Sequence, residues 1–176
     1  MTRLKTTIAL VAAAMLAGAG AANAQAAKIN DAQIAHIAYT AGVIDVEAGQ
    51  LALKKSKTKA VRDFAENMVR DHKAVNDKAL ALVKKLKVTP QDNDTSKALA
   101  KQAAAKKAEL SKLSGAAFDK AYAANEVAFH KTVNGALEKT LIPSAQNAEL
   151  KSLLETGLKI FQGHEQHAEH VAASLK

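Results

Sequence analysis

Three of the six histidines in this chain stand in helical stretches, at positions where an apolar residue would continue the pattern. His72 follows Met68 by four residues, His130 precedes Val133 by three, and His164 likewise has apolar neighbours three and four residues away. Residues three or four apart lie on the same face of a helix. We therefore expect all three imidazoles to face the core.

Two carboxylates also stand at positions where an apolar residue would continue the helical pattern. Glu126 precedes His130 by four residues, and Glu47 lies three residues after Ile44 and four before Leu51. An isolated charge in a protein core costs several kcal/mol, so buried carboxylates need partners. Imidazoles and carboxylates that face one another inside a helical bundle are ligands for Zn, Fe, Cu or Ni. The sequence predicts a transition-metal site formed by Glu47, His72, Glu126, His130 and His164.

The same side chains have a second interpretation. They can hydrogen-bond to one another, to Tyr122 or to buried water, and so fix only the register of the helices. The protein would then be a structural module, or a module that contacts a protein or the cell envelope. His167 and His170 form a further histidine edge with His164, although histidines near a chain end are more often solvated. His36 has no clear partner, and the Lys/Ala segment 97–107 is interpreted as a solvated face.

The first 24 residues are typical of a secretory signal peptide. Arg3 and Lys5 precede the uncharged run 6–22, which ends in the small-residue motif Ala22-Asn23-Ala24. We expect cleavage after Ala24, a periplasmic location, and one domain over residues 25–176. We expect no transmembrane segment after cleavage, because no second long apolar run follows.

Composition removes several classes of function. The chain has no cysteine, which excludes disulfides, thiolate ligands and a lipidated cysteine. Only 3% of its residues are aromatic, which leaves little material for stacking sugars or bases. Its net charge of +8 favours at most weak contact with an anionic envelope surface, and we expect no nucleic acid as partner in an exported protein. A protein partner cannot be named from the sequence. No nucleotide or hydrolase motif is present, so nothing indicates an enzyme.

Apolar residues recur at spacings of three and four, and no strand-like alternation persists. The two prolines of this region, Pro90 and Pro143, are expected to separate helices. The pattern predicts an all-α fold, with two antiparallel helix hairpins joined by a crossover that carries a short extra helix. This is the arrangement of a ferritin-like four-helix bundle. The expected long helices are 31–55, 59–87, 114–141 and 144–175, and the short one is 95–112.

Four sequence features together are similar to a known family. They are the string Glu-Ala-Gly-Gln-Leu-Ala at 47–52, the string Val-Arg-Asp-Phe-Ala-Glu-Asn-Met-Val-Arg-Asp-His at 61–72, the string Ser-Gly-Ala-Ala-Phe-Asp-Lys-Ala-Tyr at 114–122 leading to His130, and His164. With these features the chain closely resembles the domain of unknown function 4142 (DUF4142) family of exported, ferritin-like bacterial proteins. The resemblance implies a ferritin-like bundle in the periplasm, and it implies no activity.

The chain departs from the pattern of dinuclear iron proteins with this type of fold. Those proteins need a Glu-x-x-His pair on each of two helices. Here the residues three before the histidines are Val69, Val127 and Phe161. The departure favours a histidine-rich site for one ion over a dinuclear iron oxidase. We therefore expect a periplasmic binding or stress-related protein that holds a transition metal.

Overall fold

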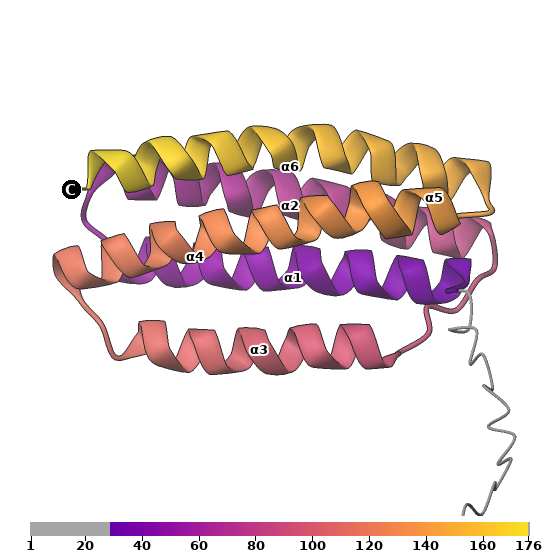
Figure 1. The fold of residues 1–176 in the computed structure, drawn as a ribbon, viewed down its shortest axis with the longest axis horizontal. Coiled ribbons are helices and arrows are strands. Elements are labelled where there is room, and N and C mark those ends of the chain that lie inside the picture. The colour runs from indigo at the N-terminus through magenta and orange to yellow at the C-terminus, as the bar shows by residue number, and fades with distance from the viewer. Residues whose placement is uncertain (1–28, 176) are drawn as a thin grey trace, which may run out of the picture.

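The computed structural model describes residues 29–175, and within that range the chain is helical without any strand (Figure 1). The all-α prediction is confirmed. The expected signal peptide, residues 1–24, lies outside the described residues. The helices in chain order are α1 (Asp31–Lys55), α2 (Lys59–Lys85), α3 (Asp94–Ser111), α4 (Gly115–Ala136), the π-helical turn η1 (Leu137–Leu141), α5 (Ile142–Ser144) and α6 (Ala148–Ser174).

Figure 1 shows the long helices α1, α2, α4 and α6 side by side along one axis. Helix α1 packs against α2, α4 packs against α6, and α2 and α6 also contact each other. Helix α3 lies on the outside against α1 and connects the end of α2 to the start of α4 (Figure 1). Within residues 29–175, no helix combines the length and the apolar character that crossing a membrane requires.

Asparagine caps fix where several helices begin. The Asn30 side chain accepts a hydrogen bond from the backbone N–H of Gln33, and the Gln33 side chain accepts one from the backbone N–H of Asn30. Asn93 and Ser96 form the same capping box at α3. Asn147 caps α6 through the N–H groups of its first turn. The Asp31 carboxylate accepts from the backbone N–H groups of Gln146 and Asn147, both at 2.8 Å, which joins the start of α1 to the start of α6.

The expectation that Pro143 lies between helices is wrong. Helix α4 continues through η1 into α5, and Pro143 stands within α5. Proline has no N–H and cannot make an intrahelical hydrogen bond, and helices often adjust locally near such a residue. Here the N–H of Ile142 bonds to the carbonyl of Leu137, five residues back. The helical path therefore ends only after Ser144.

The core consists of two apolar clusters separated by a polar layer. One cluster surrounds Phe64, Met68 and Tyr122, and the other surrounds Leu137 and Phe161. Along α2, α4 and α6, a histidine stands at the point where the chain passes from one cluster to the other. The buried polar residues of this layer are Asp45, His72, Glu126, His130 and His164.

Candidate metal centre

The three predicted histidines meet inside the bundle. His72 comes from α2, His130 from α4 and His164 from α6, and their residues are only 1%, 1% and 6% exposed. One ring nitrogen of each lies within 4.8 Å of one nitrogen of each of the others. His164 Nδ1 and His72 Nε2 lie 3.2 Å apart. The structure thus brings together three imidazoles from three helices, as the sequence predicts.

The outer nitrogen of each histidine faces an oxygen. His130 Nδ1 donates to the backbone carbonyl of Glu126 at 2.9 Å, and His164 Nε2 donates to Asp71 Oδ2 at 3.0 Å. His72 Nδ1 lies 3.4 Å from Asp45 Oδ2, which is longer than a good hydrogen bond. These acceptors favour a proton on each outer nitrogen, so the lone pairs remain on the inner ones. Metal-binding histidines are held in this way.

Asp71 suits its role as an acceptor. Its side chain is partly exposed, and Arg70 donates two hydrogen bonds to it, at 2.7 and 3.0 Å. The bonded Arg70 guanidinium lowers the pKa of the Asp71 carboxyl. Asp71 therefore stays ionised and can accept from His164 over the physiological pH range.

Two buried carboxyls lie on the other side of His130. Asp45 of α1 and Glu126 of α4 are 2% and 1% exposed, and each offers an oxygen within 4.8 Å of the other and of a His130 nitrogen. Burial raises the pKa of Glu126 to about 8. Burial, together with the charge of Glu126, raises the pKa of Asp45 well above its usual value. Without a cation, this carboxyl pair keeps a proton at neutral pH.

The imidazoles are in the protonation state that a metal needs. Burial lowers the pKa of His130 to about 4 and the pKa of His72 well below its ordinary value, and it lowers the pKa of His164 as well. All three rings are neutral at pH 7 for this reason. A neutral imidazole is the form that coordinates metal ions.

Several polar atoms in this layer have no hydrogen-bond partner among the described residues. They are Asp45 Oδ1, Glu126 Oε2, His130 Nε2 and His72 Nδ1, of which the last has only the long contact to Asp45 Oδ2. The hydroxyl of Tyr122, in the adjoining apolar cluster, also has no partner among these residues. Buried polar groups in folded proteins are nearly always paired, and an unpaired one costs about 1–3 kcal/mol. So many in one layer point to a ligand that completes it, either a cation or bound water.

Neighbouring side chains hold the layer in place. Phe161 stacks on the His72 ring, with centroids 4.4 Å apart and planes at 4°. The Asn125 amide donates to Glu126 Oε1 at 3.2 Å. At Gly42 a Cβ would overlap the Asn76 side chain, so glycine allows this amide to pack against α1. Fixed orientation of this kind reduces the reorganisation needed when an ion binds.

Glu47 does not join the cluster. The expected inward position is not what the structure shows, because the Glu47 side chain is 50% exposed and pairs with Lys107 of α3 at 2.7 Å. Asp45 stands in the layer instead, and the sequence reasoning missed it. A signal was present, because Asp45 continues the row of small residues Ala41, Gly49 and Ala52, which face the bundle.

The remaining histidines lie apart from the centre. His167 contacts the Phe64 ring edge-on, with centroids 5.1 Å apart, and His170 is exposed. His36 is half-buried near the start of α1. Within residues 29–175, the groups of side chains close enough to share an ion include His72, His130 and His164. They do not include His36, His167 or His170.

The cluster has the dimensions of a transition-metal site. Two nitrogens bound to tetrahedral zinc at about 2.0–2.1 Å are separated by about 3.3 Å. The 3.2 Å between His72 Nε2 and His164 Nδ1 matches this value. The other pairs of histidine nitrogens in this group, which lie within 4.8 Å, need side-chain shifts of at most about 1.5 Å to reach the same spacing. The donor set therefore fits a divalent ion such as Zn²⁺.

Fold and site together define a helical bundle with a buried histidine and carboxylate layer that could hold a metal. A comparison with protein-family models matches residues 16–171 to the family described as "Domain of unknown function (DUF4142)". The chain belongs to this family, as its sequence features indicated. No curated protein and no solved structure matches it significantly.

Proposed function

We propose that this protein is a periplasmic metal-binding protein with a ferritin-like four-helix bundle. One ion is held by His72 Nε2, His130 Nε2 and His164 Nδ1. A carboxylate from Asp45 or Glu126 completes the shell. The observation that carries the proposal is the set of outer oxygens beside three histidines, because these oxygens leave inner nitrogens that lie within 4.8 Å of one another for an ion.

The ferritin-like part of the proposal rests on the order of the helices. Helices α1 and α2 form one pair and α4 and α6 another, and α3 crosses between the two pairs on the outside. Two hairpins joined by one long crossover are typical of ferritin-like folds. The periplasmic part rests on the signal-peptide pattern at residues 1–24.

The ligand set restricts the ion. Three imidazoles and one carboxylate suit Zn²⁺, Cu²⁺, Ni²⁺ or Fe²⁺, whereas Mg²⁺ and Ca²⁺ prefer all-oxygen shells. Only one nitrogen of each histidine faces inward, which favours one ion over two. The role proposed is to hold this ion, and no reaction is assigned.

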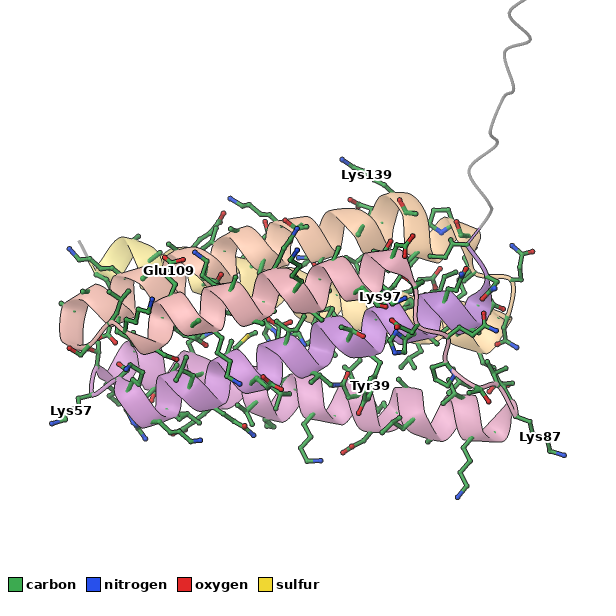
Figure 2. All side chains as sticks on the ribbon, turned by 90° about the horizontal axis from the view of Figure 1, so that it is seen from below. Tyr39, Lys57, Lys87, Lys97, Glu109 and Lys139 are labelled. Carbon is green, nitrogen blue, oxygen red and sulfur yellow. The ribbon has the colours of Figure 1, made fainter. Side chains whose placement is uncertain are left out.

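A second candidate function is a structural module that contacts the cell envelope. Asp71, His164, His72 and Asp45 form a polar chain across α2, α6 and α1, which would fix the register of these helices without a metal. Figure 2 shows Lys57, Lys87 and Lys139 extending away from the bundle, where they could contact an anionic surface. In this alternative the histidines serve packing alone.

Metal content distinguishes the two candidates. The protein is purified from the periplasm without an affinity tag, loaded with Zn²⁺ and desalted, and its metal is measured by mass spectrometry. We expect about one zinc per chain, and we expect it to be lost in the His72→Ala/His130→Ala double variant. The matched control is His170→Ala, which removes an exposed histidine and should retain the zinc.

Thermal melts provide the second measurement. Zinc should raise the melting temperature of the wild type and of the His170→Ala control, because an ion that binds only the folded state stabilises it. If the wild type binds none of Zn²⁺, Cu²⁺, Ni²⁺ and Fe²⁺ and its melting temperature ignores them, the metal proposal fails. The structural module then becomes the working view.

A further inference from the structure

A cavity of about 170 Å³ lies directly beside the proposed metal centre. Asp45, His72 and Phe161 line it on the side of the centre, and Asn76 adds one amide. Most of the remaining wall is apolar, with side chains from α1, α2, the α4–η1 segment and α6. Representative wall residues are Ile37, Ala41, Val75, Leu137 and Leu154.

The wall chemistry restricts what the cavity can hold. A buried water needs two to four polar partners, and cavities lined by Leu, Ile and Phe stay dry. A charged ligand would lose its hydration without a counter-charge on the apolar side. An uncharged apolar molecule loses little favourable hydration when it enters, and it gains van der Waals contact with the wall.

The volume restricts the size of the occupant. An engineered apolar cavity of about 150 Å³ in another protein binds benzene or xenon. At about 170 Å³, this cavity has room for a molecule of similar size. A close-packed core normally contains few voids larger than a water molecule, so such a volume is unusual for purely structural packing.

We propose that this cavity is a binding site for a small uncharged apolar molecule, up to about the size of a benzene ring. Its occupant lies against Asp45 and His72 and therefore next to the bound ion. The inference deepens the proposed function by giving the metal centre a neighbouring ligand site. Only the proximity to an ion rests on the proposed function, because the apolar walls can bind the molecule without metal.

The cavity borders a larger groove under α3. This groove, of about 570 Å³, lies between α3 and the pair α1 and α4. Tyr39, Leu99 and Thr132 line both the groove and the cavity, so these three residues stand at their boundary. Leu99 belongs to α3, the outermost helix in Figure 1. Small movements of α3 would therefore open the way inward.

Benzene and xenon serve as probes. Benzene at millimolar concentration should raise the melting temperature of the wild type, and xenon should show a shifted ¹²⁹Xe signal with the folded protein. The variant Ala41→Leu fills the cavity from α1 and should abolish both effects. The matched control is Ala52→Leu, the same change at another buried position of α1 that does not line the cavity, and it should keep both effects.

A second variant covers the case in which Ala41→Leu fails to fold. Leu154→Ala enlarges the cavity and should allow toluene to raise the melting temperature more than it does in the wild type. The inference is overturned if neither benzene nor xenon affects the folded wild type. It is also overturned if Ala41→Leu folds and responds to both probes as the wild type does.

Loading with Co²⁺ tests the position beside the ion. Co²⁺ is paramagnetic, so it should increase the relaxation rate of bound benzene protons, whereas Zn²⁺ should not. Metal content is measured on the same samples. Benzene binding without metal uptake would refute the metal centre and leave the cavity site intact. Metal uptake without benzene or xenon binding would refute the cavity site and leave the metal centre intact.

Discussion

Asp71 decides which nitrogen of His164 faces inward. Its carboxylate accepts from His164 Nε2, which leaves Nδ1 free to face His72. Such outer partners typically change metal affinity about 10–100-fold when they are removed. The proposed metal centre would therefore depend on a partly exposed residue that does not itself contact the ion.

The variant Asp71→Ala tests this dependence. We expect the dissociation constant for zinc, measured by competition with a chelator, to rise about 10–100-fold. The control Asp77→Ala removes an exposed carboxylate of the same helix that pairs only with Lys73, and its affinity should match the wild type. Equal affinities for both variants would show that Asp71 plays no part in holding His164.

Glu126 should make the stability of the metal-free protein depend on pH. Its pKa is about 8 in the folded state, compared with a usual value of 4.5. Between these values the folded state keeps a proton that the unfolded state has released, so stability falls as the pH rises, by at most about 1.4 kcal/mol per unit. Below pH 4.5 this loss is absent.

The variant Glu126→Gln removes this effect, because its amide cannot ionise. We measure the free energy of unfolding in denaturant with a chelator present. From pH 5 to pH 8, this free energy should increase by about 1–4 kcal/mol for Glu126→Gln relative to the wild type. The buried histidines are common to both proteins and cancel in the comparison. Parallel pH profiles for the two proteins would mean that Glu126 is not held neutral.

At the scale of single residues, the histidines could be predicted and their partners could not. His72, His130 and His164 each interrupt an apolar row, which a sequence shows directly. Asp71 is partly exposed and looks like any other charged residue of a helix surface. Asp71 becomes important only because α6, which is distant in the sequence, packs against α2 and brings His164 next to it.

At the scale of elements, α1 explains the exchange of Glu47 for Asp45. This helix has two contact faces, because Ile44 and Leu51 line the groove under α3 while Asp45 faces the bundle. In the second half of α1 the large side chains mark the face toward α3, whereas Ile34 and Ile37 in the first half pack in the bundle core. The face toward α2 uses small residues, and at Gly49 a Cβ would lie only 3.1 Å from the Ala65 carbonyl oxygen. Hydrophobic periodicity therefore identified the core face in the first half of α1 and the wrong face around Glu47.

Helix α3 should be the least stable of the long elements. Its buried residues are Ser96 and Leu110, and its links to α1 include the exposed pair Lys107 and Glu47. Exposed ion pairs contribute about 0–1 kcal/mol, and weakly packed elements open locally before the whole protein unfolds. Hydrogen exchange followed by mass spectrometry should show faster exchange in α3 than in α2. Equal protection of the two helices would contradict this.

At the scale of the whole molecule, the polar layer divides the core in two. The cluster around Phe64 and the cluster around Leu137 meet only through the layer that holds the histidines and carboxyls. An ion there would join α2, α4 and α6, and α1 through Asp45. Binding should therefore stabilise the whole bundle, by about 2.7 kcal/mol when the free ion is at 100 times its dissociation constant.

The arrangement of the helices could be predicted further than the details of the site. Strong apolar periodicity placed the long helices to within a few residues, because this signal is local. The π-helical turn before Pro143 could not be foreseen, since a proline after a helical stretch usually marks its end. The pairing of Asp45 with Glu126 could not be predicted either, because it depends on how α1 is rotated about its axis when it packs in the bundle.

X-ray absorption at the zinc edge tests the central claim most directly. The sample is untagged protein loaded with one equivalent of Zn²⁺, and the spectrum counts the imidazoles bound to the ion. We predict three imidazole nitrogens and one carboxylate oxygen at about 2.0–2.2 Å. A spectrum with one imidazole or none, or a zinc that leaves on desalting, would contradict a centre formed by His72, His130 and His164.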